Sequence, residues 1–231
     1  MIEEPPLLTI KRPSRRPTGA QIAAFRGMPA AVVTDAMEGA GTLAAAIGPL
    51  DPASPEVPVV GPALTAGCGP GDILALQGAI ALMTSGDVLV AGFDGWQGCA
   101  VMGDRFAGML RNQGAAGLVT DGPVRDAEGI VAAGLKVWCT GRTPASPVSN
   151  GPGTVGLPVQ IGGQRVETGD MIVADRDGVV VVPFAEIDRV AARAAEILGL
   201  EAGLDARVAA GLGAPNWVRE LLDSDRVRWL D

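Results

Sequence analysis

Residues 86–126 read GDVLVAGFDGWQGCAVMGDRFAGMLRNQGAAGLVTDGPVRD, and two kinds of pattern alternate along them. A turn at Gly86-Asp87 leads into the apolar run 88–90, residues 100–111 carry apolar side chains at helical spacing, and a second apolar run follows at 117–120. An alternation of strand, helix and strand is typical of α/β organisation. This stretch therefore predicts an α/β fold.

The same alternation extends in both directions from this stretch. Thr18 is a suitable cap for a short helix, Pro29 suits the first turn of the next one, and Gly39 and Gly41 end it. Expected helices cover residues 22–25, 29–37, 72–83 and 125–133, and expected strands cover residues 59–65, 135–140, 159–161, 171–173 and 179–182.

The C-terminal part of the sequence predicts helices that pack on the core or on a partner chain. Residues 184–211 keep apolar residues at helical spacing, and Pro215 ends this pattern. Trp217 and Trp229 follow, and such aromatic residues are suited to a subunit interface. We expect an N-terminal arm over residues 1–17, an α/β domain over residues 18–212 and a C-terminal helical tail over residues 213–231.

The composition excludes several classes of partner. The 231 residues include 18 Lys plus Arg against 26 Asp plus Glu, a formal net charge of −8, so we expect neither nucleic acid nor an anionic membrane surface as a partner. The acidic, proline-bearing start is unlike a secretory signal, and no apolar run is long enough to span a bilayer, which favours a cytoplasmic protein. The three cysteines have no CxxC spacing and are expected to be ordinary buried thiols.

The absence of two residue types restricts the chemistry further. The chain contains no His and no Tyr, so it can build neither a Ser-His-Asp triad nor a histidine-ligated zinc site. Only Lys11 and Lys136 could form a Schiff base. Chemistry in this chain must therefore depend on carboxylates, arginines, backbone amides, water and a metal.

One arrangement of charged residues fits these limits: Asp104, followed after twenty intervening residues by Arg125-Asp126. Both acidic positions fall where a strand or loop enters a helix, and the free N–H groups of the first helical turn after Gly103 favour an anion such as a substrate carboxylate. Arg125 offers a planar donor fork for a carboxylate or an enolate oxygen. Asp126 can hold Mg²⁺ or Mn²⁺ through one oxygen and leave the other positions to water and substrate.

A small 2-oxo acid such as pyruvate or oxaloacetate suits such a site. If its carboxylate and 2-oxo oxygen chelate the cation, cleavage of the bond beyond C3 leaves an enolate whose charge the cation offsets. Asp104, or a water that it orients, is the candidate for moving protons. The alternative interpretation is structural, because Asp is common at helix starts and Asp121-Gly122 is an ordinary turn dipeptide.

Several runs in the sequence resemble the RraA-like family. They are residues 86–90, 100–104, 117–126, 161–163 and 177–183, and the resemblance covers residues 20–212. Enzymatic members of this family include the class II 4-hydroxy-4-methyl-2-oxoglutarate/4-carboxy-4-hydroxy-2-oxoadipate aldolases. The resemblance implies a swivelling β/β/α sandwich with a C-terminal helical extension, assembled as homotrimers or homohexamers with active sites between subunits.

The resemblance also assigns roles to individual residues. Arg125 matches the substrate-binding arginine, Asp126 the metal-binding aspartate and Asp104 the acidic residue of the aldolase motif. Glu201 matches a glutamate that a neighbouring chain contributes near the metal, although Glu196 is close enough in sequence to fill that position, and a solvated helix charge is the other interpretation of Glu201. The backbone amides that match the cradle of the pyruvyl carboxylate belong to Gly103, Asp104, Arg105 and Phe106.

The expected function is a metal-dependent pyruvate aldolase with oxaloacetate decarboxylase activity. Many relatives carry Asn where Ile73 stands and a larger aromatic residue where Met102 stands, so the substrate side chain can differ. The alternative is a regulator that binds a ribonuclease, in which the position of Asp104 is typically Gly. A methyltransferase finds no support, because the glycine-rich run at 67–71 is interrupted by Pro70 and is better explained as a turn.

Overall fold

The computed structural model describes residue 4, residues 6–53 and residues 56–230. The chain forms two compact units, Met1–Ala194 and Ala195–Asp231, and the boundary lies within the long helix α6. The strands are β1 (Leu8–Ile10), β2 (Gly48–Pro49), β3 (Val59–Gly67), β4 (Val88–Gly92), β5 (Gly117–Thr120), β6 (Val137–Cys139), β7 (Gly153–Val155), β8 (Val159–Ile161), β9 (Gln164–Val166), β10 (Met171–Ala174) and β11 (Val179–Val182). The helices are α1 (Gly19–Phe25), α2 (Ala30–Ala36), α3 (Leu74–Leu82), α4 (Asp104–Asn112), α5 (Ala127–Ala132), the 3₁₀ helix η1 (Phe184–Glu186), α6 (Ile187–Ala209) and α7 (Asn216–Leu222).

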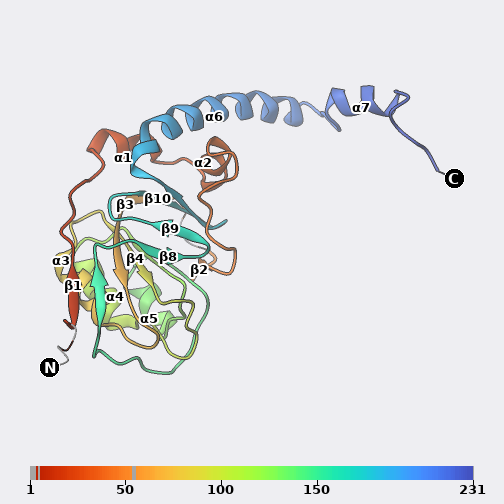
Figure 1. Ribbon diagram of the computed structural model, residues 1–231. Helices are drawn as coiled ribbons and strands as arrows, with labels where there is room; N and C mark the ends of the chain where they lie inside the picture. Colours follow the sequence, from red (N-terminus) through yellow and green to blue (C-terminus); the bar gives the residue numbers. More distant parts are fainter. Residues whose placement is uncertain (1–3, 5, 54–55, 231) are drawn as a thin grey trace. The chain divides into compact units, whose positions relative to one another are not determined.

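The first unit is built on a sheet in the order β1-β7-β3-β4-β5-β6-β2. Strands β3, β4, β5 and β6 are parallel neighbours, and β7 and β2 flank them in the antiparallel direction. The first half of β3 pairs with β10, which pairs in turn with β11, so β3 belongs to two strand arrangements at once. Helices α1 and α2 cover the part of the sheet formed by β3, β10 and β11 (Figure 1).

Both faces of the central strands are buried, because each face packs against a different layer. On β4, Leu89 and Ala91 point into a cluster with the inner faces of α3, α4 and α5. Val88 and Val90 point the opposite way, into a cluster with residues of β8, β10 and β11. Continuous apolar runs are what a strand buried on both faces requires, so the runs at 88–90 and 117–120 become central strands.

The structure confirms the α/β fold class and most of the expected elements. Thr18 caps α1 as expected, and its side chain and that of Gln21 form a reciprocal capping box. Some helix starts were expected too early. Residues 100–103 are not helical, because Val101 N–H donates to the Pro123 carbonyl at 2.8 Å; α3 begins at Leu74 rather than at residue 72, and α5 begins at Ala127 rather than at residue 125. Strands β1, β2, β7 and β9 were not expected from the sequence.

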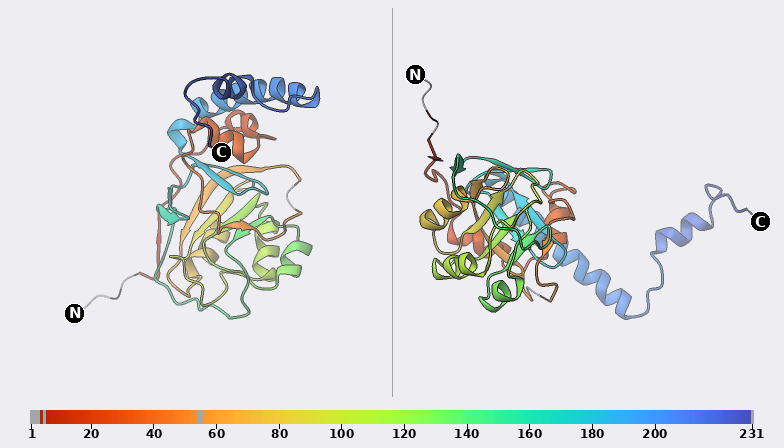
Figure 2. Two further views of the ribbon diagram at one scale, coloured as in Figure 1. Left: turned by 90° about the vertical axis from the view of Figure 1, so that its right-hand side faces the viewer. Right: turned by 90° about the horizontal axis from the view of Figure 1, so that it is seen from below.

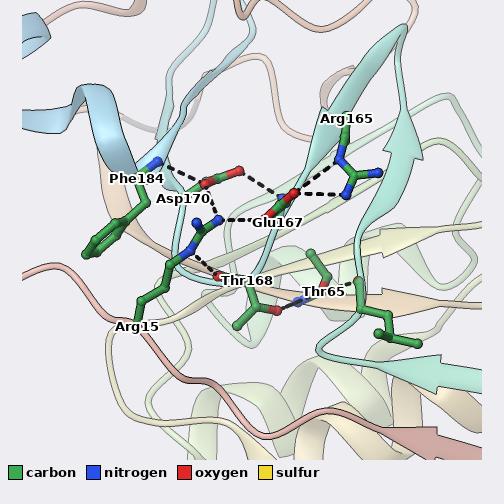
Figure 3. Close-up of polar contacts among 8 residues, drawn as sticks. Arg15, Thr65, Arg165, Glu167, Thr168, Asp170 and Phe184 are labelled. Carbon is green, nitrogen blue, oxygen red and sulfur yellow. Dashed lines mark hydrogen bonds and ion pairs between the residues drawn. The ribbon is translucent and has the colours of Figure 1, made fainter.

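The expected N-terminal arm is part of the first unit and contacts its strands. Residues 1–3 and 5 of the arm lie outside the described residues, but β1 pairs in parallel with β7. Arg15 donates to the carboxylates of Glu167 and Asp170 at 2.8 and 3.2 Å, and its guanidinium lies 5.3 Å from the ring centroid of Phe184 (Figure 3). The Asp170 side chain is only 5 % exposed, so this ion pair ties the arm to a carboxylate that has little access to water.

The glycine-rich run at 67–71 joins β3 to α3, so it is a strand-to-helix connection as well as a turn. Asp72, at the end of this run, accepts from the N–H of Leu74 at 2.8 Å and from the N–H groups of Asn150 and Gly151. The Asp72 carboxylate therefore links the start of α3 to the loop at residues 150–151.

The second unit holds the end of α6 and all of α7, and it exposes large apolar side chains. Those with the greatest exposure are Leu200 at 70 %, Trp217 at 66 %, Trp229 at 73 % and Leu230 at 81 %. A single chain leaves these side chains to solvent, which is typical of an interaction surface. Across the described residues no helix is long and apolar enough to cross a membrane. The division of the sequence into an arm, a domain and a tail at residues 17 and 212 stays a prediction.

Candidate active site

The first helical turn of α4 forms one wall of the site. Gly103 is the N-cap, it contributes no side-chain cap, and its carbonyl accepts from the N–H of Ala107 at 3.2 Å. The N–H groups of residues 104–106 have no acceptor within the helix, which is the normal state of a first turn. These donors and the positive end of the helix dipole favour a carboxylate at this position.

The connection from β5 to α5 places Arg125 and Asp126 beside this turn. The N–H of Arg125 donates to the Met102 carbonyl at 3.0 Å, and the N–H of Val124 donates to the Gly141 carbonyl at 2.9 Å. These two backbone bonds fix the chain next to Gly103. Twenty residues separate Asp104 from Arg125 in sequence. They comprise the rest of α4 and the strand β5, after which the chain returns to the start of α4.

Asp126 has a left-handed backbone, with φ 55° and ψ 42°, at the N-cap of α5. A non-glycine residue in this conformation costs about 1–2 kcal/mol, so the surrounding structure must enforce it. An added Cβ at Gly103 would overlap the Asp126 Oδ2 atom. Glycine at position 103 thus leaves the space that this carboxylate occupies.

The Arg125 guanidinium is held from two sides. Its Nη1 donates to Ser146 Oγ at 2.6 Å, and its Nε lies 3.4 Å from Asp126 Oδ2. The side chain remains 39 % exposed, so it is oriented without being buried. Sequence reasoning missed Ser146, because it lies in the loop between β6 and β7, where no periodic pattern places a side chain.

Asp104 lies where α4 approaches α5, and the two helices are neighbours in both views of Figure 2. An added Cβ at Gly129 on α5 would lie 2.7 Å from Asp104 Cβ and 3.0 Å from its Oδ2. Close packing against a glycine therefore positions Asp104, although its carboxylate is open to solvent.

These residues share one open pocket of about 520 Å³. The predicted residues Asp104, Arg125 and Asp126 all line it, and Phe106 and Met109 form its apolar side. Met109 was not predicted; its signal is helical spacing, since it lies one turn beyond Phe106 on α4. The full lining consists of Gly103, Asp104, Arg105, Phe106, Met109, Arg125 and Asp126.

Glu201 is not among the residues that line this pocket. Glu201 and Glu196 are exposed residues of α6 in the second unit, whereas the pocket belongs to the first. The expectation that one of them reaches the site of a neighbouring chain stays a prediction.

Asp121 has a structural role that its turn-forming sequence only partly indicates. Its carboxylate accepts from the N–H of Phe93 at 2.6 Å and from the N–H of Gly95 at 2.9 Å. Burial raises the pKa of Asp121, although these two backbone donors act in the opposite direction. The residue therefore shapes the loop after β4 rather than lining the pocket.

The donor set fits a hard divalent cation held by few protein ligands. In the part of the chain that the structure describes, no three His, Cys, Asp or Glu side chains gather to hold a metal. Asp126 nevertheless presents a half-exposed carboxylate to the pocket in the space left by Gly103. Mg²⁺ and Mn²⁺ accept one or two carboxylates and complete their shell with water and substrate oxygens, so Asp126 would hold such an ion and Asp104 would lie nearby.

The chain is similar to known proteins over most of its length. A sequence profile of the RraA-like family, described as Aldolase/RraA, matches residues 30–181. A protein of Halalkalibacterium halodurans named "Putative 4-hydroxy-4-methyl-2-oxoglutarate aldolase" is 36 % identical over 173 residues, which cover 75 % of this chain and 81 % of that protein.

Solved structures show the same relationship. An uncharacterized protein from Pseudomonas syringae superposes with a TM-score of 0.76 at 25 % identity, over 87 % of this chain and 93 % of that one. Streptomyces coelicolor RraAS2, described as an unusual member of the RNase ES inhibitor RraA protein family, superposes with a TM-score of 0.74 at 29 % identity, over 84 % and 99 % of the two chains. The chain therefore belongs to the RraA-like family.

Proposed function

We propose that this chain is a divalent-metal-dependent pyruvate aldolase that also decarboxylates oxaloacetate. The substrates are 4-hydroxy-4-methyl-2-oxoglutarate or 4-carboxy-4-hydroxy-2-oxoadipate. The observation that carries the proposal is the meeting of the α4 N-terminus, Asp104, Arg125 and Asp126 in one pocket. The name of the H. halodurans relative and the lack of His and Tyr in this chain point to the same chemistry.

Each of these residues has a separate role in a retro-aldol cleavage. The N–H groups of residues 104–106 bind the C1 carboxylate, and Arg125 faces the 2-oxo oxygen. The C3–C4 bond breaks, its electron pair forms the enolate of pyruvate, and the C4 hydroxyl loses its proton to Asp104 or to a water that Asp104 orients. A cation on Asp126 would supply Lewis-acid stabilisation of the charge on the 2-oxo oxygen. Protonation at C3 then completes pyruvate.

Pyruvate release tests this proposal directly. The purified chain should release pyruvate from 4-hydroxy-4-methyl-2-oxoglutarate and from oxaloacetate with Mg²⁺, and lose this activity after exhaustive chelation with EDTA. Arg125→Ala and Asp126→Ala should each reduce kcat/KM by about 100-fold or more, because the first removes a positive charge from beside the developing enolate and the second removes the carboxylate that would hold the cation. Arg111→Gln, on the same helix but outside the pocket lining, is the matched control and should match the unchanged chain.

Two outcomes would count against the proposal. Activity that survives chelation would show that the reaction does not depend on a metal. Full activity in Arg125→Ala or Asp126→Ala would show that the residue has no role in catalysis. Borohydride with pyruvate should trap neither Lys11 nor Lys136. A trapped adduct would replace the metal mechanism with a Schiff base.

We further propose a homotrimer or homohexamer in which Glu201 serves the site of a neighbouring chain. The exposed apolar side chains of the second unit support contact with another copy. Separately inactive Asp126→Ala and Glu201→Ala chains, unfolded together and refolded as mixed oligomers, should then regain part of the activity. Mixed oligomers without activity would assign Glu201 to its own chain or to no catalytic role, and Glu196→Ala in the same assay distinguishes the two glutamates.

The second candidate, a regulator that binds a ribonuclease, is favoured by the likeness to RraAS2. Asp104 argues for the enzyme, because an acidic residue at the helix start serves proton movement and is not needed for a docking surface. Inhibition of a ribonuclease by the chain, together with no pyruvate release from either substrate, would select the regulator.

A further inference from the structure

The side chain of Arg105 is the one cationic group of the pocket that has no assigned partner. Arg105 is exposed on the first turn of α4 and lines the pocket. Among residues 4, 6–53 and 56–230 its guanidinium makes no hydrogen bond or ion pair, whereas Arg125 is held by Ser146 and Asp126. The pocket thus contains one fixed guanidinium and one available guanidinium.

With a divalent cation on Asp126, the charge of the pocket would favour a ligand with two negative charges. The two guanidiniums of Arg105 and Arg125 balance the two carboxylates of Asp104 and Asp126. A divalent cation on Asp126 would add two positive charges. A dicarboxylate then neutralises the site, whereas a monocarboxylate leaves one positive charge without a counterion.

The two carboxylates of such a ligand would have different partners in the pocket. The C1 carboxylate is assigned to the backbone N–H groups of residues 104–106, and Arg125 is next to Asp126. The long side chain of Arg105 starts from the same turn and lines the same pocket. A second carboxylate lies roughly 5 Å from the first in a five-carbon 2-oxo acid, which is within the reach of an arginine side chain.

We propose that the Arg105 guanidinium binds the carboxylate beyond the bond that is cleaved, and so selects dicarboxylic over monocarboxylic 2-oxo acids. This inference rests on the proposed aldolase function and adds a role for the side chain to the role already expected of the Arg105 amide. A planar fork can hold the distal carboxylate through two parallel hydrogen bonds. The same contact retains the second product until the enolate is protonated.

A matched pair of substrates tests the proposal. 4-Hydroxy-4-methyl-2-oxoglutarate carries the distal carboxylate, and 4-hydroxy-4-methyl-2-oxopentanoate has a methyl group in its place; both release pyruvate. The unchanged chain should prefer the dicarboxylate in kcat/KM. In Arg105→Gln this preference should fall at least about tenfold, the value of a hydrogen bond to a charged group. Arg105→Lys should keep part of the preference, because lysine retains the charge without the planar fork.

The outcomes distinguish this inference from the function on which it rests. Without pyruvate release from either substrate by the unchanged chain, the aldolase function itself fails. With pyruvate release, an equal loss on both substrates in Arg105→Gln overturns the distal role. The affinity for oxalate, which fills only the pyruvyl part of the site, should be the same in Arg105→Gln as in the unchanged chain, and a weakened oxalate affinity also overturns the proposal. Arg111→Gln should keep the original substrate preference.

Discussion

Gly103→Ala tests whether the wall of α4 and the Arg125–Asp126 pair form one site. The added methyl group would overlap Asp126 Oδ2 and lie 3.2 Å from both Cγ and Nε of Arg125. The backbone of Gly103, at φ −126°, is available to alanine, so the effect comes from space alone. Both neighbouring side chains are partly exposed and can move away, at a cost in stability of about 1 kcal/mol or less.

The same movement should be costly for catalysis. A displacement of about 1 Å in groups that position a substrate can reduce the rate about 100-fold, so kcat/KM for pyruvate release should fall by this order while the melting temperature changes by only a few degrees. Gly108→Ala is the matched control on α4, because an added Cβ at Gly108 meets no atom within 4 Å. That control should keep full activity and gain about 0.5–1 kcal/mol of stability. Activity of Gly103→Ala within about threefold of the unchanged chain would refute the arrangement of the site.

Three further predictions concern the fold. Trp138→Phe should lower the free energy of unfolding by about 2–3 kcal/mol in thermal or urea denaturation. The fully buried indole donates to the Asp175 carbonyl at 2.7 Å, and phenylalanine has no donor for this bond. An unchanged free energy of unfolding would contradict this role. Arg15→Ala should lower the free energy of unfolding by about 1–2 kcal/mol near neutral pH and by less at about pH 4. Burial raises the pKa of Asp170, and protonation of Asp170 removes the charge that Arg15 offsets. A loss of stability that grows as the pH falls would contradict this prediction. The folded chain should not react with a thiol reagent at about pH 8, since all three cysteines are buried and burial raises the pKa of Cys68 to about 12. Rapid labelling of the folded chain would contradict the burial of these thiols.

The parts of the fold that the sequence predicts well are those with strong local signals. The helix cap at Thr18 and the apolar runs that became β4, β5 and β11 are specified by residues that are close together in the sequence. Strands β1 and β7 have three residues each, and each depends on pairing with a segment far away in the sequence. Such pairing leaves no periodic pattern in a three-residue run.

The candidate site was predictable in part for the same reason. Asp104, Arg125 and Asp126 follow apolar runs at the starts of helices, where local patterns place them. Ser146 and the space beside Gly103 depend on loops and on close approach between distant segments, which no local pattern specifies. Residues 100–103 were expected to be helical from the spacing of apolar residues over 100–111, but Val101 and Met102 pack in the core and the backbone of this segment bonds to other loops.

The binding of oxalate, an analogue of the pyruvate enolate, with and without Mg²⁺ tests the central claim most directly. Calorimetry should show oxalate binding to the unchanged chain with Mg²⁺, no measurable binding after chelation, and no measurable binding to Asp126→Ala under either condition, because cation and 2-oxo acid share one site. Equal oxalate affinity with and without the cation, or unchanged affinity in Asp126→Ala, would contradict a metal-dependent site at the start of α4.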